Sequence, residues 1–312
     1  MIRDPRKVFE AAFTKIGETN QSVLAVSCDS AKGAGMQSFI DCFPDRYIEV
    51  GISEQTAITI CAGLAESGFK PVLAAITPFI TMRAYEQVRN DIGYANMDVT
   101  LVGSGGGLAY STLGSSHEAI EDIALMRTIV NMVILVPGDG NEIEQSLQMA
   151  VDHKGPVYLR MPRHPLRDIP TEANEKFEIG KSRCLRQGKD VLILTYGTMI
   201  NEVIDAAEIL EAKGISASIE SFLTVKPINV DALFNLCQSY DHIVTVEEHV
   251  KTAGFGSYIS ELLADKDFKG KQHILGVEEG SKRVGPYNEI LKVYGLSKDR
   301  IAERIEELIK SK

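Results

Sequence analysis

The chain has 312 residues, 44% of them apolar and 24% charged, and its formal net charge is −10 at pH 7. This composition is typical of a globular protein with two domains of ordinary size, and its acidity argues against a nucleic-acid partner, which would need a basic surface. No apolar run is long enough to span a bilayer and the first residues do not resemble a signal peptide, so we expect no membrane partner; the scattered cysteines are typical of reduced thiols and a cytoplasmic location. The five cysteines lack CxxC spacing and the six histidines lack metal-ligand spacing, so we also expect free thiols and no metal site within the chain.

Strands and helices are predicted to alternate through the first half of the chain. Short apolar runs predict strands over 22–27, 47–50, 71–77, 99–102, 132–136 and 156–161. Helical spacing predicts helices over 7–19, 53–68, 83–92, 117–127 and 141–151, the second of them capped by Ser53. Such alternation is typical of a mainly parallel sheet covered by helices.

The second half repeats this alternation after a polar stretch rich in proline and glycine. Strands are predicted over 190–195, 216–222, 242–246 and 274–277, and helices over 201–213, 231–237, 254–264 and 297–309. We therefore predict an α/β fold with two mainly parallel-sheet domains, residues 1–165 and 188–312, joined by a linker over 166–187. Glu247, Glu248 and His249 follow a predicted strand, and we expect them to form a solvated acidic edge.

Several polar or aromatic residues follow predicted strands, at the sheet edge where α/β folds bind ligands. Glu54 is placed in the first turn of an apolar helix after the strand-breaking Gly51, although an isolated glutamate often only favours the helix dipole. Asp29 follows the strand over 22–27, where a turn aspartate is equally plausible. Phe79 and His117 have ordinary structural readings as a core aromatic and a helix-start histidine.

Seven motifs, in order along nearly the whole chain, resemble one family. They are Cys28-Asp29, Tyr47 to Gln55, Arg83-Ala-Tyr-Glu-Gln87, His117-Glu-Ala-Ile-Glu-Asp122, Val136-Pro-Gly-Asp139, Arg160-Met-Pro-Arg163 and Val246-Glu-Glu-His249. Together they resemble the pyrimidine-binding and carboxyl-terminal domains of transketolases and of 1-deoxyxylulose-5-phosphate synthases. The diphosphate-binding domain of that family is not represented. The chain therefore resembles the carboxyl-terminal half of a transketolase, carried as a separate subunit.

The resemblance implies roles for individual residues. Glu54 would share a proton with the aminopyrimidine ring of thiamine diphosphate, Phe79 would stack on that ring, and Asp29 would lie on the thiazolium side. His117 would contact the substrate. Arg163 would hold the terminal phosphate of a sugar phosphate, with Arg160 and Arg6 as further anchors.

The resemblance also implies a partner chain. Gly138-Asp139-Gly140 is similar to the start of the family's magnesium motif, but the asparagine that completes the motif is missing, and we interpret the segment as a turn before a helix. We expect the Mg²⁺ ligands to come from an amino-terminal, diphosphate-binding transketolase subunit in an α2β2 heterotetramer. The expected reaction transfers a two-carbon ketol unit from a ketose to an aldose.

Other functions are compatible with the same motifs. The chain resembles, less closely, part of a split 1-deoxyxylulose-5-phosphate synthase or the β subunit of a 2-oxo acid dehydrogenase, and a non-catalytic assembly subunit is a further alternative. Leu113 and Gly105 stand where most transketolases have an aspartate and a histidine. We therefore expect a less polar pocket there and an atypical donor, such as an unusual ketose phosphate or sulfonate.

Overall fold

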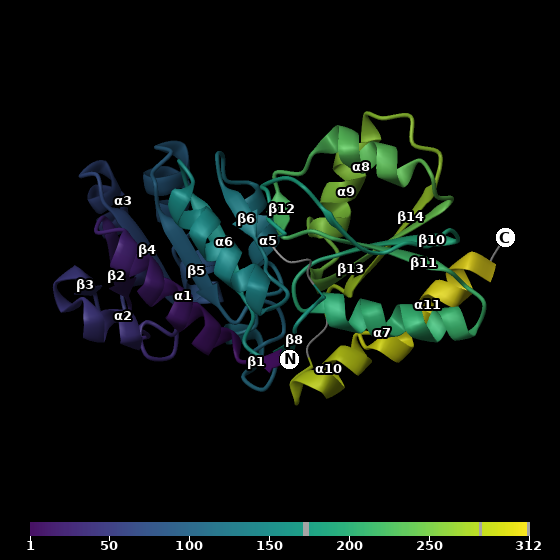
Figure 1. Ribbon diagram of the computed structural model, residues 1–312, viewed down its shortest axis with the longest axis horizontal. Coiled ribbons are helices and arrows are strands. Elements are labelled where there is room, and N and C mark those ends of the chain that lie inside the picture. The colour runs from purple at the N-terminus through teal and green to yellow at the C-terminus, as the bar shows by residue number, and fades with distance from the viewer. Residues whose placement is uncertain (171–174, 281–282, 311–312) are drawn as a thin grey trace.

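A computed structural model describes residues 1–170, 175–280 and 283–310. Two β-sheets lie side by side, each between layers of helices, and the amino terminus lies near the junction between them (Figure 1). The α/β fold with mainly parallel sheets is confirmed. In the part of the chain that the structure describes, no helix is both long and apolar enough to cross a bilayer.

The first sheet has seven strands in the order β12-β6-β7-β5-β4-β2-β3. Their bounds are β2 Val23–Ser27, β3 Tyr47–Glu49, β4 Lys70–Ile76, β5 Thr100–Ser104, β6 Val133–Leu135, β7 Val157–Met161 and β12 Thr224–Lys226. All neighbouring pairs are parallel except β12 with β6. The inner strands β2, β4 and β7 consist almost wholly of buried residues, as expected for a parallel sheet covered on both faces, whereas the edge strand β3 has none.

Helices cover both faces of this sheet. On one face α1 (Pro5–Thr19) and α6 (Gly140–Asp152) pack with α2 (Gln37–Cys42). On the other face lie α3 (Glu54–Glu66) and α5 (Asp122–Arg127), with a helical stretch between β4 and β5. That stretch consists of π-helical turns over Phe79–Arg83 and Val88–Tyr94 around the short α4 (Tyr85–Gln87), so the regular helix predicted over 83–92 was wrong in type.

The second sheet has five strands in the order β14-β13-β10-β11-β9. Their bounds are β9 Arg183–Arg186, β10 Val191–Thr195, β11 Ala217–Ser221, β13 His242–Val250 and β14 Lys271–Val277, and β9 is antiparallel to β11. One face carries α8 (Val230–Cys237) and α9 (Phe255–Ala264). The other carries α7 (Met199–Ala212), α10 (Tyr287–Val293) and α11 (Lys298–Lys310).

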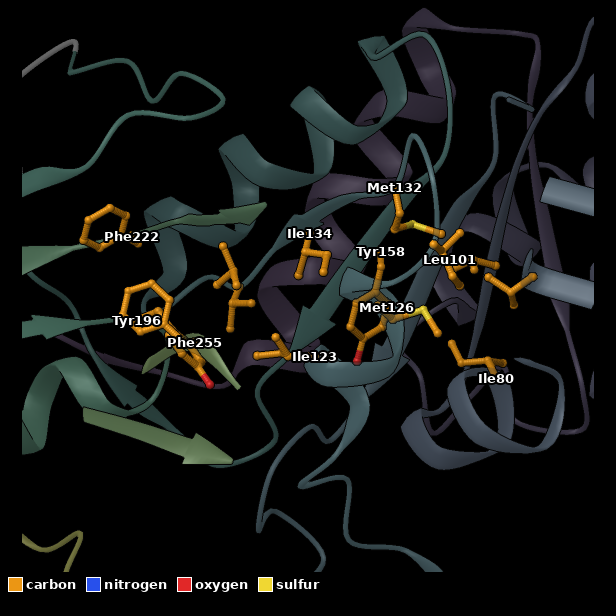
Figure 2. Packing of buried hydrophobic residues seen from close by; sticks show 14 of the residues in the cluster. Ile80, Leu101, Ile123, Met126, Met132, Ile134, Tyr158, Tyr196, Phe222 and Phe255 are labelled. Carbon is orange, nitrogen blue, oxygen red and sulfur yellow. The ribbon is translucent and has the colours of Figure 1, made fainter. Parts of the chain in front are cut away.

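The two sheets are joined through strands and through a shared core. β12 lies within the second predicted domain, after β11, and crosses back to complete the first sheet. β1 (Ile2–Arg3) pairs with β8 (Leu166–Arg167) at the start of the predicted linker. Residues 171–174 of the linker lie outside the described residues. Figure 2 shows Ile123 and Ile134 from the first sheet's layer in one cluster with Tyr196, Phe222 and Phe255 from the second. Burying this apolar surface holds the two sheets against each other.

Candidate active site at the carboxyl edge of the first sheet

The carboxyl ends of four adjacent parallel strands form one edge of the first sheet. Asp29 follows β2, Phe79 follows β4, the loop from Gly105 to His117 follows β5, and Arg163 follows β7. Parallel pairing puts these ends on the same side, which is where open α/β sheets bind ligands. The topology therefore gathers all these predicted residues at one edge.

Glu54 is the first residue of α3 and is only 3% exposed. Its Oε2 accepts a hydrogen bond of 2.9 Å from Nη1 of Arg83, and the Arg83 guanidinium lies 4.3 Å from the centre of the Phe79 ring. Arg83 thus joins the buried carboxylate to the aromatic face. Ser53 precedes the helix as predicted, but its hydroxyl bonds to Thr56 and not to a backbone amide, so its predicted capping bond was wrong.

His117 continues this line of contacts. Its ring lies edge-on to Phe79, with 5.4 Å between the ring centres, and 5.9 Å from the ring centre of Tyr110. Its Nδ1 is 2.8 Å from Oγ of Ser116, which leaves Nε2 as the nitrogen available to a ligand. The predicted helix over 117–127 begins only at Asp122, so His117 lies in a loop after a 3-10 turn and not at a helix start.

Arg163 and Arg6 line one cavity of about 460 Å³, together with Ser104 and His164. Nη1 of Arg163 donates to the hydroxyl of Tyr110 over 2.9 Å, and its guanidinium lies 4.4 Å from the centre of the same ring. Both arginines are exposed. The structure thus brings together two predicted anion anchors that are far apart in the sequence.

Asp29 lines a neighbouring cavity of about 440 Å³ that Ser104 and Tyr110 also line. Asp29 is exposed and has a φ of +53°, a strained conformation for a residue with a side chain. Its amide donates to Oε1 of Glu49, as does the amide of Gly51, over 2.8 and 2.7 Å. Burial opposes ionisation of Glu49, but these amides and the Tyr47 hydroxyl outweigh it and lower the pKa of Glu49. A charged Glu49 therefore holds the Asp29 loop against the start of α3.

Arg160 does not lie with the other anchors. It is 4% exposed, its Nε donates to Oδ2 of Asp122 over 2.8 Å, and its Nη2 donates to the carbonyl oxygens of Ala119 and Glu248. A guanidinium enclosed in this way is part of the protein interior. The geometry therefore gives Arg160 a structural position, contrary to the prediction that it contacts substrate.

Glu247, Glu248 and His249 are also buried, so the expected solvated acidic edge was wrong. All three lie within β13 and are at most 1% exposed. Glu247 accepts from the amides of Phe255 and Gly256 at the start of α9. Burial raises the pKa of Glu247 to about 8 and lowers that of His249 to about 4.

Among the described residues, no group of three or more His, Cys, Asp or Glu side chains is placed to hold a metal ion. Asp139 is buried at the start of α6, where its Oδ1 accepts from the amide of Glu142 and its Oδ2 from that of Ile169. This is the predicted turn before a helix. All five cysteines are free.

Two contributors to the site were not identified from sequence. Arg83 stood out only as part of a motif, and Tyr110 was not predicted at all. The only sequence signal for Tyr110 is its place in a glycine-rich loop after a strand. Leu113 is 54% exposed and lines neither of the two cavities.

A buried carboxylate, an aromatic face and two arginines thus lie together at the carboxyl edge of a parallel sheet, where α/β folds bind ligands. Residues 3–168 match the family model of the transketolase pyrimidine binding domain, and residues 180–301 match that of the transketolase C-terminal domain. The chain belongs to the transketolase family and corresponds to its carboxyl-terminal half.

Two curated relatives match over nearly their whole length. A putative transketolase C-terminal section of Methanocaldococcus jannaschii is 34% identical over 98% of this chain and 96% of its own. One subunit of an apulose-4-phosphate transketolase of Phocaeicola vulgatus is 31% identical over 98% of this chain and 97% of its own. A 1-deoxy-D-xylulose-5-phosphate synthase of Symbiobacterium thermophilum is 35% identical, but the chain spans only 46% of its length.

Solved structures of transketolases superpose on this chain. One of them is a split gene transketolase in an inactive beta4 tetramer, which superposes on this chain with a TM-score of 0.87 at 30% identity. The superposition covers 98% of this chain and 98% of the other. A transketolase of Pichia stipitis superposes with a TM-score of 0.84 at 22% identity, and this chain covers 46% of it, which shows the fold alone.

Proposed function

We propose that this chain is the carboxyl-terminal subunit of a split, thiamine-diphosphate-dependent transketolase that transfers a two-carbon ketol unit from an anionic ketose to an aldose. The observation that carries the proposal is the buried carboxylate of Glu54 next to the Phe79 ring, at the same sheet edge as Arg163. Transketolase-family members generally use thiamine diphosphate, and an aminopyrimidine needs both a carboxyl group and an aromatic face. The residues present fit that half of the cofactor.

When bound, the cofactor supplies a carbon nucleophile that takes up the two-carbon unit. Glu54 would hold a proton at the aminopyrimidine ring nitrogen, and Phe79 would stack on the ring, a contact worth about 0.5–1.5 kcal/mol beyond burial. Arg83, which is 48% exposed, pairs with Glu54, and its guanidinium lies 4.3 Å from the centre of the Phe79 ring, so it fixes the carboxyl group next to the aromatic side chain. Asp29 borders the neighbouring cavity and would lie on the thiazolium side of the cofactor.

The remaining residues bind the sugar. The free Nε2 of His117 orients a substrate oxygen, since its Nδ1 is bonded to Ser116. Arg163, with Arg6 across the same cavity, holds the anionic end of the sugar. Arg160 is left out of this binding role because its guanidinium is enclosed by Asp122 and two carbonyl oxygens.

A partner chain supplies the diphosphate and Mg²⁺ contacts, because Mg²⁺ needs several oxygen ligands and the described residues offer no such group. Of the two relatives that match over nearly their whole length, one is named as a C-terminal section and the other as a subunit, which supports division of the enzyme between two chains. We propose an α2β2 assembly. The relative named for apulose 4-phosphate supports an atypical ketose phosphate as donor.

A 1-deoxyxylulose-5-phosphate synthase-like activity is the second candidate, because relatives of that name reach 35% identity. Co-expression with a chain that carries the family's complete magnesium motif separates the two candidates. Ketol transfer from a ketose phosphate to an aldose phosphate would support the proposal. Decarboxylative condensation of pyruvate with glyceraldehyde 3-phosphate would favour the second candidate, and assembly without either reaction would reject both.

A further inference from the structure

Tyr110 stands at the boundary between the two cavities of the candidate site. It lines the cavity that Asp29 borders, and it contacts Arg163, which lines the other. Ser104, Gly33 and Ala34 line both cavities, so the two are neighbours. Tyr110 therefore lines one cavity directly and reaches the other through its contact with Arg163.

Gly105 makes room for this tyrosine. It has a φ of +75°, and a Cβ atom built on it would lie 2.4 Å from Cε2 of Tyr110. A side chain at position 105 would therefore displace the ring. The space that a residue at 105 would fill is taken by Tyr110, whose phenol brings a polar group back to this part of the site.

The hydrogen atom of the Tyr110 hydroxyl is available to a ligand. It accepts the hydrogen bond from Nη1 of Arg163, and within the described ranges no acceptor is placed for its own hydrogen. A phenol both donates and accepts one hydrogen bond, and a guanidinium carries five N–H donors. The other N–H groups of Arg163 likewise have no acceptor among the described residues. The pair therefore presents only donors to a ligand.

We propose that Tyr110 and Arg163 form a two-residue clamp for a tetrahedral oxyanion, the phosphate or sulfonate at the end of the substrate. The Arg163 guanidinium binds oxygen atoms of the anion, and the Tyr110 hydroxyl donates to one of them. The ring beneath the guanidinium holds the arginine in its orientation. This inference rests on the proposed function for the identity of the substrate, but anion binding by the clamp is independent of turnover.

The charges that line the Arg163 cavity suit an anion, because Arg6 lines it together with Arg163. The adjacent cavity is lined by Lys32 and by the carboxylates of Asp29 and Glu49, so the positive charge is concentrated in the Arg163 cavity. Asp4 is the one acidic residue among the lining residues of the Arg163 cavity, and its Oδ1 accepts from the amides of Arg6 and Lys7 at the start of α1. These amides partly offset the negative charge of Asp4.

The first test uses the purified chain, with methyl phosphate and methanesulfonate as probes in separate titrations. Tyrosines labelled with 13C report the Tyr110 resonance by NMR, and Tyr110→Phe assigns it. We expect methyl phosphate to shift this resonance and Tyr110→Phe to weaken binding about 10-fold, because a hydrogen bond to a charged group is lost while the ring is kept. Arg163→Ala should weaken binding at least as much.

Tyr94→Phe is the matched control. Tyr94 is 82% exposed and precedes β5, at the opposite edge of the sheet, so its loss should leave the affinity unchanged. Equal affinity of wild type and Tyr110→Phe for methyl phosphate, or no binding by the wild type, would overturn the clamp. Stronger binding of methanesulfonate than of methyl phosphate would identify the anion as a sulfonate.

The second test uses the complex with the partner chain. Tyr110→Phe should raise the Michaelis constant for xylulose 5-phosphate about 10-fold and leave that for uncharged xylulose and kcat nearly unchanged. A change in kcat alone would contradict a binding role. If the complex shows no ketol transfer but the chain binds methyl phosphate through Tyr110, the proposed function fails and the clamp stands.

Discussion

The carboxyl edges of the two sheets carry similar residues in opposite surroundings. After β2 and β7 of the first sheet, Asp29 and Arg163 are exposed and border cavities. In β13 of the second sheet, Glu248 is 1% exposed, and its carboxylate accepts from the Leu108 amide and from the hydroxyls of Thr198 and Tyr287. The first edge leaves polar groups available to ligands, and the second uses them to hold the protein together.

The two edges differ in whether their polar groups already have hydrogen-bond partners within the protein. A buried charged group is tolerated only when other groups pair with it, whereas a binding group must keep donors or acceptors unused. Arg160 and Arg163 illustrate this within one motif. Arg160 is enclosed by Asp122 and carbonyl oxygens, and Arg163 uses one N–H on Tyr110. Their roles differ although both belong to the same short motif.

The largest effect is expected at Glu54. Glu54→Gln keeps the shape of the side chain but removes proton exchange with the cofactor, so activity of the complex should fall by about 100-fold or more. The circular dichroism spectrum should not change. Glu66→Gln, at the exposed end of the same helix, is the control and should retain activity. If Glu54→Gln turned over substrate as fast as the wild type, the proposal that the enzyme uses thiamine diphosphate through Glu54 would be contradicted.

The next largest effect is a difference between Arg160 and Arg163 in how much each contributes to the free energy of unfolding. Arg160→Met leaves the buried Asp122 carboxylate without its charged partner, with only the Tyr158 hydroxyl still donating to it, and should lower the free energy of unfolding by about 3–5 kcal/mol. Arg163→Met removes an exposed group and should change it by less than about 1 kcal/mol. Urea denaturation of both variants measures the difference. Equal losses of unfolding free energy in the two variants would contradict the claim that Arg160 is structural and Arg163 is not.

His249 makes the second edge sensitive to acid. Its Nδ1–H donates to the carbonyl of Val250 over 2.6 Å and its Nε2 accepts from the amide of Ala124, so only the neutral ring satisfies both contacts. Burial lowers the pKa of His249 from 6.5 to about 4. At this residue the unfolded chain therefore binds a proton first, and the contribution of His249 to stability falls as the pH drops from 6.5 to 4.

This loss should reach about 3 kcal/mol, since each unit of pKa shift corresponds to about 1.4 kcal/mol. His249→Gln can still accept from Ala124 and does not titrate, so its stability should fall less over the same range. Urea denaturation of both proteins at several pH values gives the difference. Parallel pH profiles would show that His249 is not responsible.

Much of the fold followed from sequence because short apolar runs and helical spacing are local signals. The Glu54 segment was predictable in the same way, since Gly51 separates a strand from an apolar helix. The helix predicted from His117 failed because tertiary contacts override the local preference. Ala119 exchanges both backbone hydrogen bonds with Gly107, and the Ile120 carbonyl accepts from the Val250 amide.

Contacts between distant residues could not be predicted. Tyr110 and Arg163 are 53 residues apart, and Glu248 and Leu108 are 140 apart. The polar character of Glu248 predicted exposure, but the loop after β5 and helices α7 and α10 close over it. Which polar groups are paired depends on this long-range packing.

The most direct test of the account is calorimetric titration of thiamine diphosphate with Mg²⁺ into this chain, alone and with its partner. The first sheet supplies the aminopyrimidine contacts through Glu54 and Phe79, while the diphosphate needs oxygen ligands that the described residues do not gather. The account predicts negligible binding by the chain alone, tight binding by the complex, and loss of that binding in Glu54→Ala. Tight binding and full activity of the chain by itself would contradict it.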